Sequence, residues 1–317
     1  MSILSSSKIT FCPGPGALIP EWTNSQKEFF GRGDFEYTKI KKDTFKWLKK
    51  ISKKDEIIPI AGSGTTAALL AFNTFLQGKI LVIDTGYYSQ RWIDYLKKKK
   101  FKNIHTVKYD DIQNIHSTYD WIIFVYVETA TCTKFDIKKI SKIKKKLKSK
   151  LLVDATASIA LEKNHQLADV IFFSSCKGLL GPTGLGFVAC NKNIKKIQSK
   201  DFWYDYNTHS NSKYTLGYNC ISALHAISKK HNYYKNKIIF ANNVLKKYSV
   251  QKSKPLIGCK LLKKLRKKNF NKTIFYQPRV FVEFDVIFFL GIVKLDKKDI
   301  IKVLKKRIID NLNKKIV

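Results

Sequence analysis

Short, almost wholly apolar runs alternate with longer amphipathic runs through the middle of this chain, and no other feature limits the possible fold as strongly. The apolar runs are typical of strands buried on both faces, and the amphipathic runs are typical of helices. This alternation predicts an α/β fold with a mostly parallel sheet flanked by helices. The expected strands are 57–61, 80–83, 121–127, 151–153, 170–173 and 186–190, and the expected helices are 65–76, 90–100 and 137–150.

The regular alternation ends after residue 201, which indicates a second structural unit. We predict a large ligand-binding domain, including the N-terminal segment, over residues 1–235. A small C-terminal α+β domain is expected over residues 236–317. The elements expected in this part are a loop at 207–215, helix at 220–236 and onward from 237, strands at 273–284 and 287–293, and a terminal helix at 297–311.

Composition narrows the class of protein. The net charge of +36 would suit a polyanion, but only five of the 60 basic residues are arginine and the lysines are dispersed over helix faces. We therefore expect no specific nucleic-acid partner. The longest apolar run near the end, 286–293, is too short to span a bilayer, so no membrane association is expected. Six cysteines without metal-site or CxxC spacing predict reduced thiols, no metal and a cytoplasmic location.

Unusual polar residues follow the predicted strands at the points where they end. Ligands bind beyond the carboxyl ends of the strands in an open parallel sheet, so these residues should converge on one crevice. The groups are Gly62–Thr66, Asp84–Tyr88, Glu128–Thr131, Asp154 and Ser174–Lys177.

The turn Gly62–Thr65 is small, bears hydroxyl groups and leads into a predicted helix, which is a common way to hold a phosphate. It is not a P-loop, because no lysine follows the last glycine. Together with Ala67 and with Asp84 at the end of the next strand, it satisfies the dinucleotide fingerprint. Taken alone, this segment favours NAD binding.

Lys177 lies between an apolar strand and a glycine-rich turn, where partial desolvation would prepare its amine for Schiff-base chemistry. Asp154 follows another apolar strand, and capping a turn is the alternative reading of that carboxylate. A surface role remains the alternative for Lys177. A phosphate cradle, the aromatic Tyr88, an acid and such a lysine are together what pyridoxal 5′-phosphate requires. A dinucleotide site needs neither Asp154 nor Lys177, so the combination favours pyridoxal phosphate.

Several motifs in order carry a family resemblance: Cys12–Pro15, Gly62–Thr65 and Gly86–Arg91, with similarity continuing to Phe187. Over about two-thirds of its length the chain resembles the class V, fold type I, pyridoxal-phosphate-dependent aminotransferases. It looks most like the branch with 2-aminoethylphosphonate–pyruvate and serine/alanine–glyoxylate transaminases. The resemblance implies a transferase of amino groups from an amine or amino acid to a 2-oxo acid, through a ping-pong Schiff-base mechanism.

The resemblance also implies roles for individual residues. Lys177 would attach the cofactor and shuttle the proton, and Asp154 would pair with the pyridine nitrogen. Tyr88 would stack on the ring and Thr129 would reach the ring hydroxyl. The phosphate would be bound by Ser63, Gly64 and Thr65, and by Thr215 reaching into the neighbouring subunit, which implies a homodimer.

Two departures from the family pattern affect substrate recognition. Cys176 precedes the lysine where glutamine, asparagine or histidine is common. Phe289 stands where the family carries a carboxylate-binding arginine in a C-terminal strand. Three arginines are candidate substrate-binding replacements: Arg32, Arg279 and Arg91, which opens the helix after Tyr88. Of these, Arg32 and Arg279 are the predicted substrate-binding residues. A surface salt bridge is an equal alternative for each.

Three other functions stay open at this point. The turn Lys177–Gly184 partly resembles that of cysteine desulfurases, which suggests a pyridoxal-phosphate-dependent lyase, although Cys220 and Cys259 lack the expected loop setting. The segment Gly62–Asp84 alone suggests a dinucleotide-binding module. Phe289 and the short C-terminal domain suggest a homologue that binds the cofactor without catalysis.

Overall fold

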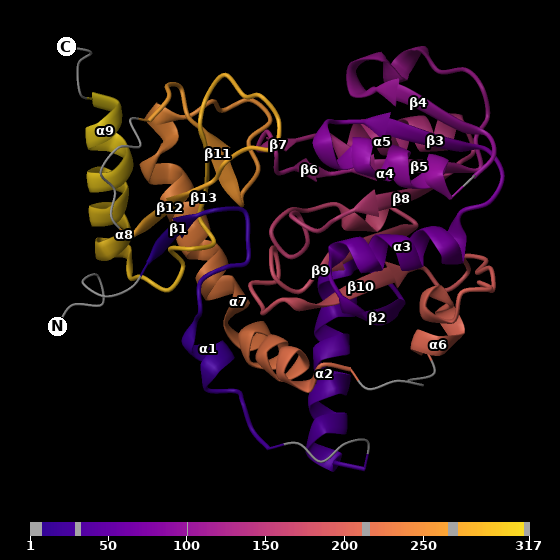
Figure 1. The fold of residues 1–317 in the computed structure, drawn as a ribbon, viewed down its shortest axis with the longest axis horizontal. Helices are drawn as coiled ribbons and strands as arrows, with labels where there is room; N and C mark the ends of the chain where they lie inside the picture. Colours follow the sequence, from indigo (N-terminus) through magenta and orange to yellow (C-terminus); the bar gives the residue numbers. More distant parts are fainter. Residues whose placement is uncertain (1–7, 29–32, 100, 211–215, 266–271, 314–317) are drawn as a thin grey trace.

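A seven-stranded sheet forms the centre of the protein in a computed structural model, which describes residues 8–28, 33–99, 101–210, 216–265 and 272–313 (Figure 1). All its strands run parallel except β10, which is antiparallel to both of its neighbours. The α/β prediction is therefore confirmed. In spatial order the strands are β2 (Glu56–Gly62), β10 (Gly184–Cys190), β9 (Val170–Ser174), β8 (Lys150–Asp154), β5 (Trp121–Val125), β3 (Ile80–Asp84) and β4 (Ile104–Lys108).

The central strands are apolar at nearly every position because helices cover both faces of the sheet. Neighbouring residues of one strand, such as Phe172 and Phe173, enter different hydrophobic clusters, as the pleat requires. One face packs against α3 (Gly64–Phe75) and α4 (Tyr87–Lys98). The other packs against α2 (Phe35–Ser52), α5 (Ile137–Lys146) and the first part of α7 (Tyr218–Val244).

Some elements differ from the sequence prediction. The edge strand β4 was not predicted, because its sequence IHTVK is neither continuously apolar nor alternating, and none of its residues is buried. The strand predicted over 121–127 ends at Val125, with the two-residue strand β6 (Val127–Glu128) paired to β7 (Thr133–Lys134). The helix predicted over 137–150 ends at Lys146, and its last lysine begins β8. The predicted loop 207–215 begins with a short helix, α6 (Tyr206–Ser210), and its remainder lies outside the described residues.

The C-terminal elements form a separate hydrophobic cluster that α7 reaches with its second half. Here β11 (Gly258–Lys260) pairs with β13 (Val286–Phe288), and β12 (Thr273–Phe275) pairs with the N-terminal strand β1 (Ile9–Phe11). The long strands predicted over 273–284 and 287–293 are wrong. The first ends before Pro278, which has no N–H for a ladder, and the second turns after Phe288.

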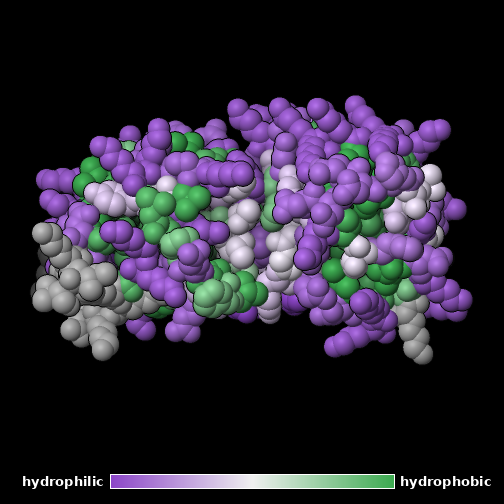
Figure 2. All heavy atoms as spheres, turned by 90° about the horizontal axis from the view of Figure 1, so that it is seen from above, coloured by the Kyte–Doolittle hydropathy of each residue, from purple (hydrophilic) through white to green (hydrophobic). Residues whose placement is uncertain are grey.

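The remaining helices are α1 (Pro20–Thr23), α8 (Lys297–Leu304) and α9 (Asp310–Asn313), the last two joined by a π-helical turn over Lys305–Ile309. No helix among the described residues has the length and apolar character needed to cross a bilayer. Hydrophilic side chains are spread over the face shown in Figure 2 rather than gathered at one place. The domain division at residue 235 falls within α7 and stays a prediction.

Candidate active site

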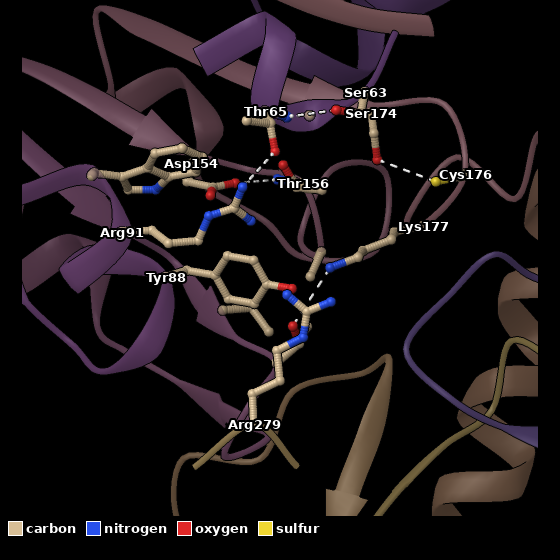
Figure 3. Close-up of a pocket in the computed structure, with 15 residues that line it drawn as sticks. Ser63, Thr65, Tyr88, Arg91, Asp154, Thr156, Ser174, Cys176, Lys177 and Arg279 are labelled. Atoms are coloured by element: carbon tan, nitrogen blue, oxygen red, sulfur yellow. Dashed lines mark hydrogen bonds between the residues drawn. The ribbon is translucent and has the colours of Figure 1, made fainter. Parts of the chain in front are cut away.

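A cavity of about 170 Å³ lies at the carboxyl end of the sheet, where the strand-end residues meet (Figure 3). The prediction of one crevice is confirmed in this geometry. Eight of the ten residues predicted to bind cofactor or substrate line it: Ser63, Gly64, Thr65, Tyr88, Thr129, Asp154, Lys177 and Arg279. The other two, Arg32 and Thr215, lie outside the described residues.

The N-terminus of α3 forms one wall of the cavity. Ser63 caps the helix, and its Oγ accepts a hydrogen bond from the Thr65 N–H at 3.1 Å. A Cβ at Gly64 would meet Thr156 Oγ1 at 3.0 Å and Ser174 Cβ at 3.6 Å, so glycine keeps this wall close to its neighbours. The positive end of the helix and these hydroxyl groups suit an anion.

Asp154 lies at the end of β8 with only 7% of its surface exposed. Burial raises the pKa of its carboxyl group, while a hydrogen bond from the Thr156 N–H at 2.9 Å and the charge of Lys177 act in the opposite direction. A buried carboxylate of this kind is stabilised by a cation placed against it. It can therefore hold a protonated ring nitrogen.

Lys177 extends into the cavity from the turn after β9. Its Nζ donates a hydrogen bond to Thr129 Oγ1 at 3.5 Å and lies 5.0 Å from the centre of the Tyr88 ring. Gly14, at a φ of +136°, packs so closely that a Cβ there would meet Lys177 Cγ at 3.0 Å. The Cys12–Pro15 motif therefore borders the side chain of this lysine, beside an aromatic ring.

Glu128 was not among the predicted site residues, although it directly precedes Thr129. It is fully buried, and its two carboxylate oxygens accept hydrogen bonds from the backbone N–H groups of Tyr88, at 2.8 Å, and Ala130, at 2.7 Å. One carboxylate thus ties the first turn of α4 to the turn that carries Thr129. An acidic residue directly after an apolar strand was the available sequence signal.

Burial raises the pKa of Glu128 from its ordinary value of 4.5 to about 7. The folded protein therefore binds one more proton than the unfolded chain between these values, so its stability should fall as the pH rises through this window. The contribution is on the order of 3 kcal/mol. We expect Glu128→Gln to remove this component, as measured by urea unfolding at pH 5 and pH 8. An identical pH dependence in both proteins would contradict the assignment.

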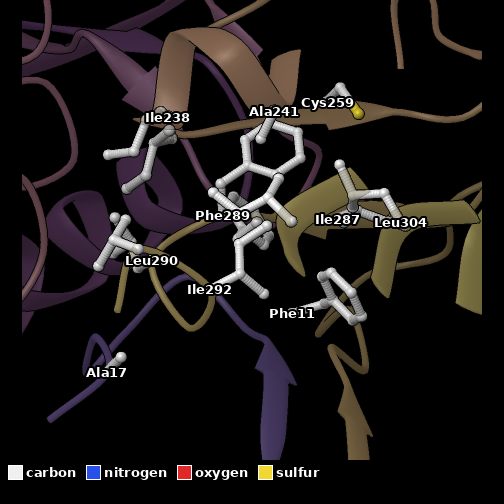
Figure 4. Packing of buried hydrophobic residues seen from close by; sticks show 14 of the residues in the cluster. Phe11, Ala17, Ile238, Ala241, Cys259, Ile287, Phe289, Leu290, Ile292 and Leu304 are labelled. Atoms are coloured by element: carbon white, nitrogen blue, oxygen red, sulfur yellow. The ribbon is translucent and has the colours of Figure 1, made fainter. Parts of the chain in front are cut away.

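Two arginines border the cavity on different sides of Tyr88, as Figure 3 shows. Arg91 Nη2 donates to Thr65 Oγ1 at 3.3 Å, at the α3 wall. Arg279 Nη1 donates to Tyr87 Oη at 3.4 Å, on the side of Lys177. Phe289 is fully buried in the C-terminal cluster among Ile238, Ala241 and Ile292 and does not line the cavity (Figure 4).

The geometry argues against two of the alternative functions, the dinucleotide-binding module and the cysteine desulfurase. Asp84 Oδ1 accepts hydrogen bonds from Gly86 N at 3.0 Å and Ser89 Oγ at 2.8 Å, so the acid of the dinucleotide fingerprint caps its own turn. Cys220 and Cys259 are buried, which raises the pKa of the first thiol to about 11 and of the second to about 12. Neither cysteine has the exposed, ionised character of a reactive thiol.

Comparison with known proteins identifies a family. The model described as aminotransferase class V matches residues 23–205, more than half of the chain. An uncharacterized aminotransferase of Helicobacter pylori is 24% identical over 225 residues, which are 65% of this chain and 60% of that protein. Serine–glyoxylate aminotransferase of Arabidopsis thaliana is 29% identical over 228 residues, which are 63% of this chain and 56% of that protein.

The fold extends the similarity over nearly all of the chain. The crystal structure of alanine–glyoxylate aminotransferase from Nostoc sp. superposes with a TM-score of 0.79 and covers 98% of this chain and 96% of its own. At 13% identity, that likeness shows the fold alone. The match to the family model, over the segment that carries the strand-end residues, decides the identification: this chain is a member of the class V aminotransferase family.

Proposed function

We propose that this protein is a pyridoxal-phosphate-dependent aminotransferase, which moves an amino group from an amine or amino acid to a 2-oxo acid. Pyridoxal 5′-phosphate is the cofactor of the family. One observation carries the proposal: Lys177 and the buried Asp154 line the same small cavity, with Tyr88 beside them. A Schiff-base amine and a ring-nitrogen partner are the two groups that this chemistry requires.

The residues present fit the cofactor. The α3 N-terminus with Ser63, Gly64 and Thr65 would hold the phosphate, because backbone N–H groups and hydroxyl groups gather at this positive end of the helix. Asp154 would hold the ring nitrogen, and Thr129 would meet the ring hydroxyl.

Lys177 and Asp154 would have different roles in the reaction. When bound, pyridoxal phosphate supplies an aldehyde that reacts with amines and a ring that withdraws electrons. Lys177 Nζ would form the attachment and later carry the proton to and from the substrate carbon, because it is the amine that enters the cavity beside Tyr88. Asp154 would keep the ring nitrogen protonated by its buried negative charge.

Assembly and location are further parts of the proposal. A homodimer is supported by the family resemblance and by exposed apolar side chains, including Phe35 and Phe202. Light scattering should then give twice the chain mass of 36.6 kDa. A cytoplasmic location is supported by the six free cysteines. The assignment of residues 1–235 to cofactor binding and 236–317 to a small domain belongs to the same proposal.

A panel of amino donors tests the function directly. The protein loaded with pyridoxal phosphate should lose its visible absorbance with at least one donor and regain it when a 2-oxo acid is added after gel filtration. Loss without recovery, or absorbance unchanged by every donor, would contradict transamination. Release of sulfide from cysteine would instead indicate the lyase.

Arg279 is proposed to bind the substrate carboxylate in place of the family arginine that Phe289 replaces. Its guanidinium faces the cavity, hydrogen-bonded to Tyr87 and stacked 5.5 Å from that ring. Arg279→Gln should lower kcat/KM for a carboxylate-bearing donor roughly 10- to 100-fold by loss of a charged hydrogen bond.

Two controls accompany that measurement. Tyr87→Phe keeps the ring and removes only the hydroxyl, so its effect should be several-fold smaller. A donor without a carboxylate should be indifferent to Arg279→Gln, and an equal loss with both donors would contradict the role. Arg32 remains a second predicted candidate.

A further inference from the structure

Arg91 is a charged side chain whose surroundings lack an obvious counter-charge. Its guanidinium lies half-buried between aromatic rings, 5.9 Å from the centre of Tyr88 and 5.5 Å from that of Trp92. Within the described part of the chain, no carboxylate lies within ion-pair distance of it, and its one hydrogen bond goes to Thr65 Oγ1. A guanidinium has five N–H donors, so most of them remain available to the cavity.

The position of Arg91 separates it from the other cations of the site. Lys177 and Arg279 approach the cavity on one side of Tyr88, whereas Arg91 lies on the other, at the wall that α3 forms. An anion held at Thr65 would therefore meet Arg91 first. Arg279, in contrast, lies on the side of the cavity where the substrate carboxylate is proposed to bind.

The α3 wall by itself offers little charge for a phosphate. A helix N-terminus is equivalent to roughly half an elementary charge, and a phosphate monoester carries between one and two negative charges at neutral pH. Cys176, next to Lys177, lines this wall with a thiol that is a weak donor, 3.7 Å from Ser174 Oγ. A guanidinium can supply both the missing charge and two parallel hydrogen bonds.

We infer that Arg91 binds the phosphate of the cofactor together with Ser63, Gly64 and Thr65, and that it sets the preference for phosphorylated over unphosphorylated pyridoxal. This inference rests on the proposed function, since it takes pyridoxal phosphate as the ligand. It assigns the charge of the phosphate site to a residue of the same chain. Cation–π contacts with the rings of Tyr88 and Trp92 help to keep the guanidinium at this wall.

The test compares two ligands that differ only in the phosphate. The protein freed of cofactor is titrated with pyridoxal phosphate and with pyridoxal, and binding is followed by absorbance and by borohydride trapping on the chain. Arg91→Gln should weaken binding of pyridoxal phosphate roughly 10- to 100-fold and that of pyridoxal by no more than about twofold. Arg91→Lys, which keeps the charge and loses the planar fork, should fall between.

Lys98→Gln is the matched control, because it removes a positive charge from the same helix at an exposed position. It should change neither affinity. Equal losses of both ligands in Arg91→Gln, or an unchanged preference, would overturn the inference while leaving the proposed function intact. Wild-type protein that captures neither ligand would instead refute the proposed function itself. Circular dichroism of each variant verifies that it is folded.

Discussion

Lys177→Ala is expected to abolish covalent capture of pyridoxal phosphate and to lower transamination roughly 10²- to 10⁴-fold or more, the range for loss of a positioned proton-transfer group. The reason is geometric: Lys177 Nζ enters the cavity between Thr129 and the Tyr88 ring, where the cofactor ring is proposed to lie. Borohydride treatment followed by peptide mass spectrometry should find the label on Lys177 in the wild type and nowhere in the variant.

Lys54 provides an internal comparison for the borohydride labelling of Lys177. Burial lowers the pKa of its amine to about 8, so Lys54 is the natural competitor for covalent capture of an aldehyde. Yet it lies just before β2, at the amino end of that strand and so at the opposite end of the sheet from the cavity, where its Nζ donates to Asn191 Oδ1 at 3.0 Å and to the Ala168 carbonyl. Label on Lys54 rather than Lys177 would refute the site. Lys192→Ala, at an exposed position, should leave trapping unchanged.

Asp154→Asn is expected to lower the rate of the amino-donor half-reaction roughly 10²- to 10³-fold. The amide has the same size but carries no negative charge, so it cannot keep a ring nitrogen protonated. Single-turnover absorbance measurements with an active donor would give the rate, and Asp94→Asn, on the exposed side of α4, should leave it unchanged.

The stability of the same variant separates a catalytic role from a structural one. Because burial raises the pKa of Asp154, the ionised group is costly in the folded protein without a cation beside it. The cofactor-free Asp154→Asn protein should therefore keep or raise its melting temperature, although the same variant loaded with pyridoxal phosphate reacts more slowly. A large drop in melting temperature would show instead that the carboxylate chiefly holds the turn at Thr156.

The large sheet could be predicted because its strands are buried on both faces and so have an unmistakable composition. The same argument placed Asp154 and Lys177 correctly in one crevice, since parallel strands bring their carboxyl ends together. The C-terminal part was harder. Its strands have only three residues each, and one pairs with Ile9–Phe11 from the far end of the chain, a contact that no local pattern encodes.

Glu128 and Arg91 show where single-sequence reasoning stops within the site. Glu128 acts through hydrogen bonds to backbone N–H groups of Tyr88 and Ala130, and its position after an apolar strand does not reveal which backbone groups it meets. From the sequence, Arg91 was weighed only as a possible substrate-binding residue or a surface salt bridge. The inference that Arg91 binds an anion depends on the absence of a nearby carboxylate in the described part of the fold, and only the three-dimensional packing reveals that absence.

The N-terminal strand β1 links the C-terminal hydrophobic core to Lys177 through a short stretch of chain. Ile9–Phe11 is paired with β12, and three residues further along Gly14 lies so close to Lys177 that a Cβ there would meet its Cγ at 3.0 Å. A truncation or a poorly packed substitution in the C-terminal core should therefore shift the N-terminal strand and with it the orientation of the Lys177 side chain. Substitutions in this core, far from the cavity, should consequently impair the same reaction steps as substitutions inside the cavity.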